Sequence, residues 1–155
     1  MKKDFVQKVI EFNEVAGTTQ TYNPRKVALY VGLQLEELAE QIESFQSTQL
    51  GNLRVALEYH SRLFKQGEFD QTVRNASTLE QRTEFLDGAI DSAVVAIGAA
   101  IAIGSDVEGA AHAVADNNLS KYPLVDGVRV VLKDANGKIQ KPPGFTSVKL
   151  DTYLV

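Results

Sequence analysis

The spacing of apolar residues predicts helices over most of the first 120 residues of this 155-residue chain. Apolar side chains recur three or four positions apart, which places them on one face of a helix that turns about 100° per residue. The segments with this pattern are residues 4–15, 24–46, 52–66, 78–103 and a last one that ends near residue 119. Residues 16–23 and 67–77 are polar, and we expect them to form loops.

Residues typical of helix ends support these boundaries. Asn23 followed by Pro24 combines a preferred N-cap with a proline in the first helical turn. Ser77 and Ser105 are each followed three residues later by a glutamate, which is the spacing of a capping box. Gly104 stands where the fourth helix is expected to stop.

The pattern changes after Pro123. Residues 128–132 are β-prone, and residues 134–137 (DANG) are typical of a hairpin turn. We therefore expect an all-α fold, with a four- to five-helix bundle over residues 1–122. A short extended or β-hairpin C-terminal arm over residues 123–155 would belong to the same domain.

An acidic cluster interrupts an apolar stripe in the second predicted helix. Glu36 and Glu40 continue the stripe that Leu29 and Leu33 begin, and Glu37 lies beside them. Surface carboxylates usually lie opposite the apolar stripe, whereas these are predicted to point toward the core. Their spacing also makes them repel one another.

A second acidic cluster lies in the fourth predicted helix. Asp87 and Asp91 share a stripe with Val94 and Ile101, and Glu84 lies at its edge. Buried like charges are costly unless a positive group joins them. Oxygen ligands suit Mg²⁺, with Mn²⁺ as a second possibility. The alternative interpretation is two solvated acidic helix faces.

The amino-acid composition excludes several classes of functional site. Hydrophobic residues make up 44% of the chain and charged residues 23%, as in ordinary globular domains. The absence of cysteine excludes disulfides, zinc–thiolate sites and thiol catalysis. A net charge of −4 argues against binding a nucleic acid polymer.

The same reasoning predicts a cytoplasmic protein. The N-terminus lacks the apolar segment of a signal peptide. The apolar run over residues 93–103 is 11 residues long, shorter than a bilayer requires, so we expect a buried bundle helix and no membrane contact.

Four short motifs, in the same order, resemble those of the MazG-like superfamily of all-α nucleoside triphosphate pyrophosphohydrolases. Relatives in that superfamily include dimeric dUTPases and phosphoribosyl-ATP pyrophosphohydrolase. The motifs are ELAE at residues 37–40, DSAVVAIG at 91–98, NLSK at 118–121 and GKIQK at 137–141. The resemblance extends from residue 5 to residue 145.

The chain departs from the family pattern at its second acidic motif. The family has an ExxD element there, but Gly88 stands three residues before Asp91. Either Asp87 supplies the missing carboxylate, which we favour, or the ExxD element is formed by Glu84 and Asp87. The segment between the two acidic motifs is also longer than in compact members of the family.

The resemblance implies an enzyme that uses Mg²⁺ to cleave a (deoxy)nucleoside triphosphate between its α- and β-phosphates, releasing a monophosphate and pyrophosphate. The expected metal ligands are Glu37, Glu40, Asp87 and Asp91. Glu36 or Glu37 would accept a proton from the attacking water. Two other functions remain open: the phosphoribosyl-ATP reaction, and a non-catalytic helical interaction domain.

The remaining motifs suggest how a nucleotide would be bound. Asn118 would contact the base or sugar, and Lys121 and Lys138 would contact phosphates. The alternative for Asn118 and Lys121 is a helix C-terminal cap and a lysine whose positive charge interacts favourably with the helix dipole. The alternative for Lys138 is a solvated loop.

We also expect a homodimer or homotetramer. Small residues over 98–100 and 109–111 permit close helix packing. The long helices are apolar on both sides and need more cover than one small bundle supplies.

Overall fold

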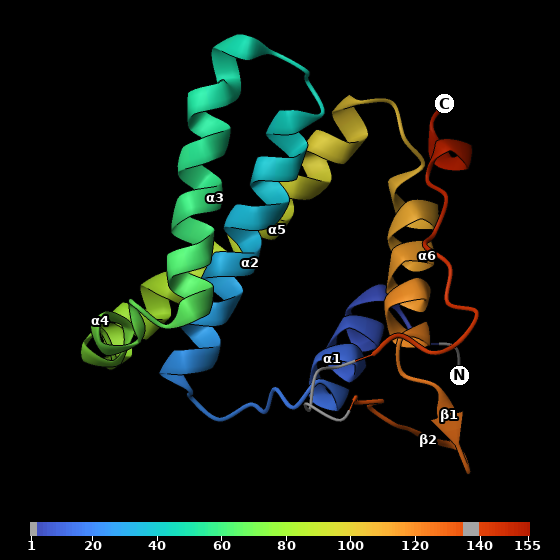
Figure 1. Cartoon of the computed structure of the whole chain (residues 1–155), viewed down its shortest axis with the longest axis horizontal. Coiled ribbons are helices and arrows are strands. Elements are labelled where there is room, and N and C mark those ends of the chain that lie inside the picture. The colour runs from blue at the N-terminus through green and yellow to red at the C-terminus, as the bar shows by residue number, and fades with distance from the viewer. Residues whose placement is uncertain (1–2, 135–139) are drawn as a thin grey trace. The chain divides into compact units, whose positions relative to one another are not determined.

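The computed structural model describes residues 3–134 and 140–155. Over these residues the chain forms six α-helices and one two-stranded antiparallel sheet, so the predicted all-α fold with a β-hairpin arm is confirmed (Figure 1). The chain divides into two compact units. One consists of Thr21–Asp87, and the other combines Met1–Gln20 with Gly88–Val155.

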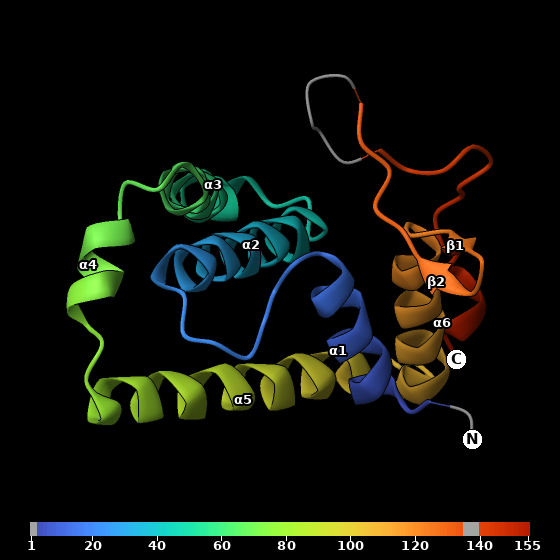
Figure 2. The same ribbon diagram turned by 90° about the horizontal axis from the view of Figure 1, so that it is seen from below.

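The Thr21–Asp87 unit is built on two antiparallel helices that lie side by side in both views (Figures 1 and 2). Its elements before residue 79 are α2 (Pro24–Glu43), η1 (Thr48–Leu50), α3 (Gly51–Gln66) and α4 (Asp70–Asn75). The side chain of Asn23 accepts a hydrogen bond from the Lys26 amide at 3.1 Å. The predicted N-cap of α2 is therefore confirmed.

Small residues let α2 and α3 approach closely. Ala28, Gly32 and Ala39 are the buried residues of α2. A Cβ atom added to Gly32 would lie 2.9 Å from the Ser61 carbonyl oxygen, so only glycine fits there without a shift. Ser61 is the buried residue of α3, and its hydroxyl makes no hydrogen bond with a described residue.

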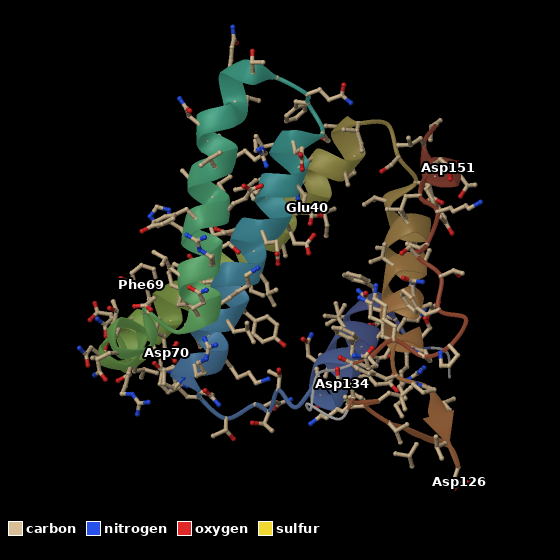
Figure 3. All side chains as sticks on the ribbon, in the orientation of Figure 1. Glu40, Phe69, Asp70, Asp126, Asp134 and Asp151 are labelled. Atoms are coloured by element: carbon tan, nitrogen blue, oxygen red, sulfur yellow. The ribbon has the colours of Figure 1, made fainter. Side chains whose placement is uncertain are left out.

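The segment predicted to be a polar loop over residues 67–77 contains the short helix α4. Apolar contact explains its position, because the Phe69 ring packs on Phe64 of α3 at 4.5 Å between centroids. Asp70 lies at the start of α4, beside Phe69 (Figure 3). Its Oδ1 is 3.4 Å from Nη1 of Arg25 in α2. These partners are distant in sequence, so local polarity alone did not indicate the helix.

The second unit pairs its N-terminal helix with its last one. It contains α1 (Phe5–Val15), α6 (Val107–Ser120), β1 (Leu124–Val125), β2 (Val128–Arg129) and η2 (Asp151–Tyr153). Helices α1 and α6 pack together. Phe12 stacks on Tyr122 at 5.2 Å, and the buried Lys8 Nζ lies 2.6 Å from Asp116 Oδ1.

A tight hairpin joins β1 to β2. Asp126 and Gly127 have φ angles of 52° and 79°, the positive values that a two-residue type I′ turn requires. Arg129 of β2 then donates to the carbonyl oxygens of Leu119 and Tyr122 at 2.9 and 3.0 Å. The other hairpin turn, predicted over residues 134–137, falls largely outside the described residues.

Helix α5 (Leu79–Ala102) crosses the boundary between the two units as one continuous helix (Figure 2). Thr78 and Gln81 form its N-terminal box, since Thr78 Oγ1 accepts from the Gln81 amide and Gln81 Oε1 accepts from the Thr78 amide. The predicted box at Ser77 is therefore wrong by one residue. Helix α6 shows the same shift, because Asp106 caps it instead of Ser105.

No described residue of α5 is buried. The prediction of a buried bundle helix is thus wrong for the single chain. The apolar run also belongs to a 24-residue helix, not to an isolated segment of 11 residues. Among the described residues, α5 alone is long and apolar enough to cross a membrane, with a mean hydropathy of 1.7 over its most apolar window. Length and composition by themselves are weak evidence for such a span.

Candidate functional site

The first acidic cluster lies on one turn of α2 and has mixed exposure. Glu36 is half-buried, and its Oε1 accepts a hydrogen bond from Lys65 Nζ of α3 at 2.6 Å. Glu37 and Glu40 are exposed, and Figure 3 shows Glu40 on α2. The Glu40 carboxylate makes no hydrogen bond or ion pair with any residue that the structure describes.

The cationic partner of Glu36 was missed by sequence reasoning. Lys65 lies 29 residues further along the chain, so no local spacing indicates the pair. The pair forms because α3 runs antiparallel to α2 and brings its last turn beside the middle of α2 (Figure 1). The Glu36 carboxylate is therefore paired with a cation within the chain.

The second acidic cluster is fully exposed on α5. Asp87 and Asp91 are four residues apart, one helical turn, and Glu84 lies one turn before Asp87. Over residues 3–134 and 140–155, none of the three has a hydrogen-bonding or ion-pairing partner. Because like charges at this spacing destabilise a helix, the cluster carries an uncompensated cost in the single chain.

The two acidic clusters are divided between the compact units. Glu36, Glu37, Glu40 and Asp87 belong to the Thr21–Asp87 unit, and Asp91 belongs to the other. No group of three or more Asp, Glu, His or Cys side chains among the described residues could hold a metal ion. The expected convergence of these acids on one cation therefore stays a prediction.

The predicted nucleotide-binding pair lies at the end of α6. Lys121 Nζ donates a 2.7 Å hydrogen bond to Asn118 Oδ1, so the two side chains are adjacent as their spacing predicts. The same ammonium lies 5.7 Å from the centroid of the Phe12 ring of α1. Lys138 lies outside the described residues.

A hollow of about 260 Å³ lies elsewhere, where α2 leads into α3. Ile42, Ser47 and Arg54 contribute to its lining, and none of the predicted site residues does. Arg54 is already engaged there, because it pairs with Glu58 and reaches Glu43 at 4.0 Å. This hollow gives no chemical indication of a ligand.

Comparisons of the chain with models of protein families, with curated proteins and with solved structures found no match.

Proposed function

We propose that this protein is a Mg²⁺-dependent nucleoside triphosphate pyrophosphohydrolase. It would convert a (deoxy)nucleoside triphosphate and water into the monophosphate and pyrophosphate. The observation that carries the proposal is the set of exposed carboxylates without a protein partner, namely Glu40 on α2 and Asp87 and Asp91 on α5. Their place in motifs that resemble the MazG-like superfamily supports the same assignment.

The chemistry of these side chains fits a hard divalent cation. All of them offer carboxylate oxygens, which Mg²⁺ and Mn²⁺ prefer over other ligands. A bound cation would also relieve the repulsion between Asp87 and Asp91. Glu37, Glu40, Asp87 and Asp91 would hold it. The proposal requires that the α2 and α5 clusters meet, through an arrangement of the two units or through a second copy of the chain.

The ion, when bound, would neutralise charge on the phosphates and lower the pKa of a coordinated water. The chain's own residues would do the rest. Glu36 or Glu37 would accept the proton of the attacking water. Lys65 would hold Glu36 in place through their 2.6 Å contact. Asn118 and Lys121 would orient the nucleotide, and Lys138 would contact a phosphate.

The direct test is a panel of ribo- and deoxyribonucleoside triphosphates incubated with Mg²⁺ or Mn²⁺. We expect pyrophosphate and monophosphate in equal amounts, with no diphosphate. Glu40→Gln and Asp91→Asn should each lower kcat by about a hundredfold, as the loss of one preorganised electrostatic contact does. Glu80→Gln is the matched control, because Glu80 is an exposed acid of α5 outside the cluster. Full activity in excess EDTA, or in the two cluster variants, would refute the proposal.

A binding measurement separates the metal site from the reaction. Mn²⁺ titrated into the protein should bind and raise its melting temperature, because a ligand of the folded state stabilises that state. Asp91→Asn should weaken this binding, whereas Glu80→Gln should not. A melting temperature that does not respond to Mn²⁺ would support two solvated acidic faces instead.

A non-catalytic helical interaction domain is the second candidate. The absence of any buried residue among those described in α5 favours it, because a long apolar helix without cover is typical of an interaction surface. The nucleotide panel distinguishes the two, since an interaction domain would release no pyrophosphate from any substrate.

A further inference from the structure

One face of α5 carries a continuous row of large apolar side chains. Helical spacing of three or four residues aligns them, and they are here named the α5 stripe. Its members and their exposed fractions are Leu86 (61%), Ile90 (58%), Val94 (62%), Ile97 (47%) and Ile101 (57%). An exposed row of this length is larger than a soluble monomer normally shows.

We propose that a second copy of this chain covers the α5 stripe, with the two α5 helices antiparallel across a two-fold axis. This inference goes beyond the catalytic proposal and does not depend on it. The first argument is size. A 24-residue helix is about 36 Å long and about 11 Å across, so half of its lateral surface is on the order of 600 Å². A specific protein interface buries about 600–1,000 Å² per partner, so this face of α5 reaches the lower end of that range.

The distribution of charge along α5 sets the orientation. The first half of the helix contains four acids and one base (Glu80, Arg82, Glu84, Asp87 and Asp91) and has a net charge of −3, whereas residues 92–102 carry no charge. In a parallel pair, the acidic half of one copy would lie beside the acidic half of the other. In an antiparallel pair, each acidic half lies beside an uncharged half. A two-fold axis also makes one patch complementary to itself, as homodimers require.

The same charges disfavour a lipid environment for α5. Asp87 and Asp91 lie inside the most apolar window of the helix, and Glu84 borders it. Ionised carboxylates within a bilayer are costly unless they are paired, and neither aspartate has a partner among the described residues. In the antiparallel pair the acids flank the stripe and stay in water.

The proposal fixes which residues meet. The acidic half of α5 meets its uncharged half between residues 91 and 92, so the two-fold axis of the antiparallel pair passes this point. Leu86 and Ile97 lie at equal distances on either side of it. Leu86 of one copy therefore lies opposite Ile97 of the other. Two Leu86 residues are separated by about 11 residues of helix, or about 16 Å.

Cysteine crosslinking tests this register, because the chain contains no cysteine. Leu86→Cys and Ile97→Cys proteins are mixed, allowed to exchange and treated with a short bismaleimide. We expect crosslinked dimer in the mixture and little in either variant alone. Crosslinking of Leu86→Cys alone would show a parallel pair and overturn the proposed orientation. Absence of crosslinking in every sample, with a monomer by light scattering, would overturn the dimer itself.

A second pair of variants tests the face without crosslinks. Ile97→Asp should raise the dimer dissociation constant at least about thirtyfold, as loss of a central interface residue does. Val95→Asp is the matched control, since Val95 is 70% exposed on the opposite side of α5, and it should change the constant less than about threefold. Circular dichroism checks that both variants keep their helices. Equal effects of the two variants, or flotation of the wild-type protein with neutral phosphatidylcholine vesicles, would overturn the proposal.

Discussion

Helices α2 and α5 are both long, amphipathic in their predicted pattern and carry an acidic cluster each, but among the residues that the structure describes only α2 has a partner helix. Helix α2 has a partner in α3, buries Ala28, Gly32 and Ala39, and ties Glu36 to Lys65. Helix α5 buries no described residue, and its aspartates have no partner there. The difference does not lie in the apolar pattern itself, which both helices possess.

What separates the two helices is the size of the residues at the contact. Small residues on α2 let the backbone of α3 come close, and the contact at Gly32 leaves no room for a side chain. The α5 stripe consists of Leu, Ile and Val, and the glycines of α5 face open space. The α3 helix of the same chain provides the close backbone contact that α2 needs. The α5 stripe of large side chains needs a broad apolar surface to cover it. We therefore test whether α2 packs closely on a helix of its own chain, and whether α5 has no close neighbour in its own chain.

The largest effect is expected from filling the contact between α2 and α3. Gly32→Ala places a methyl group 2.9 Å from the Ser61 carbonyl and 3.0 Å from Phe64 Cβ, so the helices must separate. We expect a loss of about 2 kcal/mol in the free energy of unfolding. Gly88→Ala on α5 is the control, because nothing lies within 4 Å of the added atom. It should gain about 0.5–1 kcal/mol through helix propensity.

Urea unfolding of the two glycine variants gives both values. A Gly32→Ala protein as stable as the parent would show that the close α2–α3 contact does not exist. A Gly88→Ala protein that loses stability would show that α5 has a close neighbour on that side.

The buried hydroxyl of Ser61 should give a smaller effect of opposite sign. The Ser61 Oγ atom is buried without a described hydrogen-bonding partner, which costs free energy in the folded state. Ser61→Ala should therefore stabilise the protein by about 1 kcal/mol. Ser92→Ala on α5 is the matched control, since Ser92 is exposed and its hydroxyl donates to the Gly88 carbonyl at 2.7 Å. The control should change stability by less than about 0.5 kcal/mol. A destabilised Ser61→Ala protein would reveal a partner for that hydroxyl.

The acidic clusters offer a weaker contrast. Glu36→Gln removes the ion pair with Lys65 and should cost about 0.5 kcal/mol. Asp91→Asn removes repulsion from Asp87 one turn away and should gain about 0.3 kcal/mol in the absence of divalent ions. Thermal unfolding in EDTA, at low and high NaCl, measures both. High salt should shrink the two effects. A loss of stability in Asp91→Asn under these conditions would mean that a protein group already compensates Asp91.

The local parts of the fold follow from the sequence, and the non-local parts do not. The Asn23 cap depends on residues three apart, and its position was predicted correctly. The box at the start of α5 was placed one residue early, because Ser77 and Thr78 are both good caps and local spacing does not decide between them. The Asp126-Gly127 hairpin was missed although Asp-Gly is a strong turn signal. Attention to that dipeptide would have found it.

The candidate site shows the same limit. Spacing along a helix correctly placed Asn118 beside Lys121. It did not reveal that Lys65 neutralises Glu36, since that contact depends on how α3 folds back on α2. The apolar pattern of α5 likewise predicts that the helix needs cover, but a pattern within one chain does not say which surface supplies it.

The smallest effect extends the contrast to pH. Glu11 of α1 differs from the α5 aspartates because it forms ion pairs with Lys3 at 3.0 Å and with Arg129 at 3.2 Å. The hydrogen bond from Lys3 is the main cause that lowers the pKa of Glu11 below its ordinary value of 4.5, against a smaller opposing effect of burial. The folded state therefore binds this proton less readily than the unfolded state does. The stabilisation is fully present above about pH 4.5 and is lost as the pH falls through the lower pKa of the folded protein.

Glu11→Gln tests this directly. The variant should be less stable than the parent at pH 7, by about 0.5 kcal/mol or less, and the difference should shrink as the pH falls through the lowered pKa of Glu11 in the folded protein. Asp87→Asn is the matched control on α5. Because Asp87 has like charges one turn away on both sides, Glu84 and Asp91, its replacement should instead leave the protein equal or slightly more stable at pH 7. Urea midpoints at pH 7, 5 and 3.5 supply the comparison. A Glu11→Gln difference that persists unchanged at pH 3.5 would mean that packing, and not the ion pairs with Lys3 and Arg129, accounts for the role of Glu11.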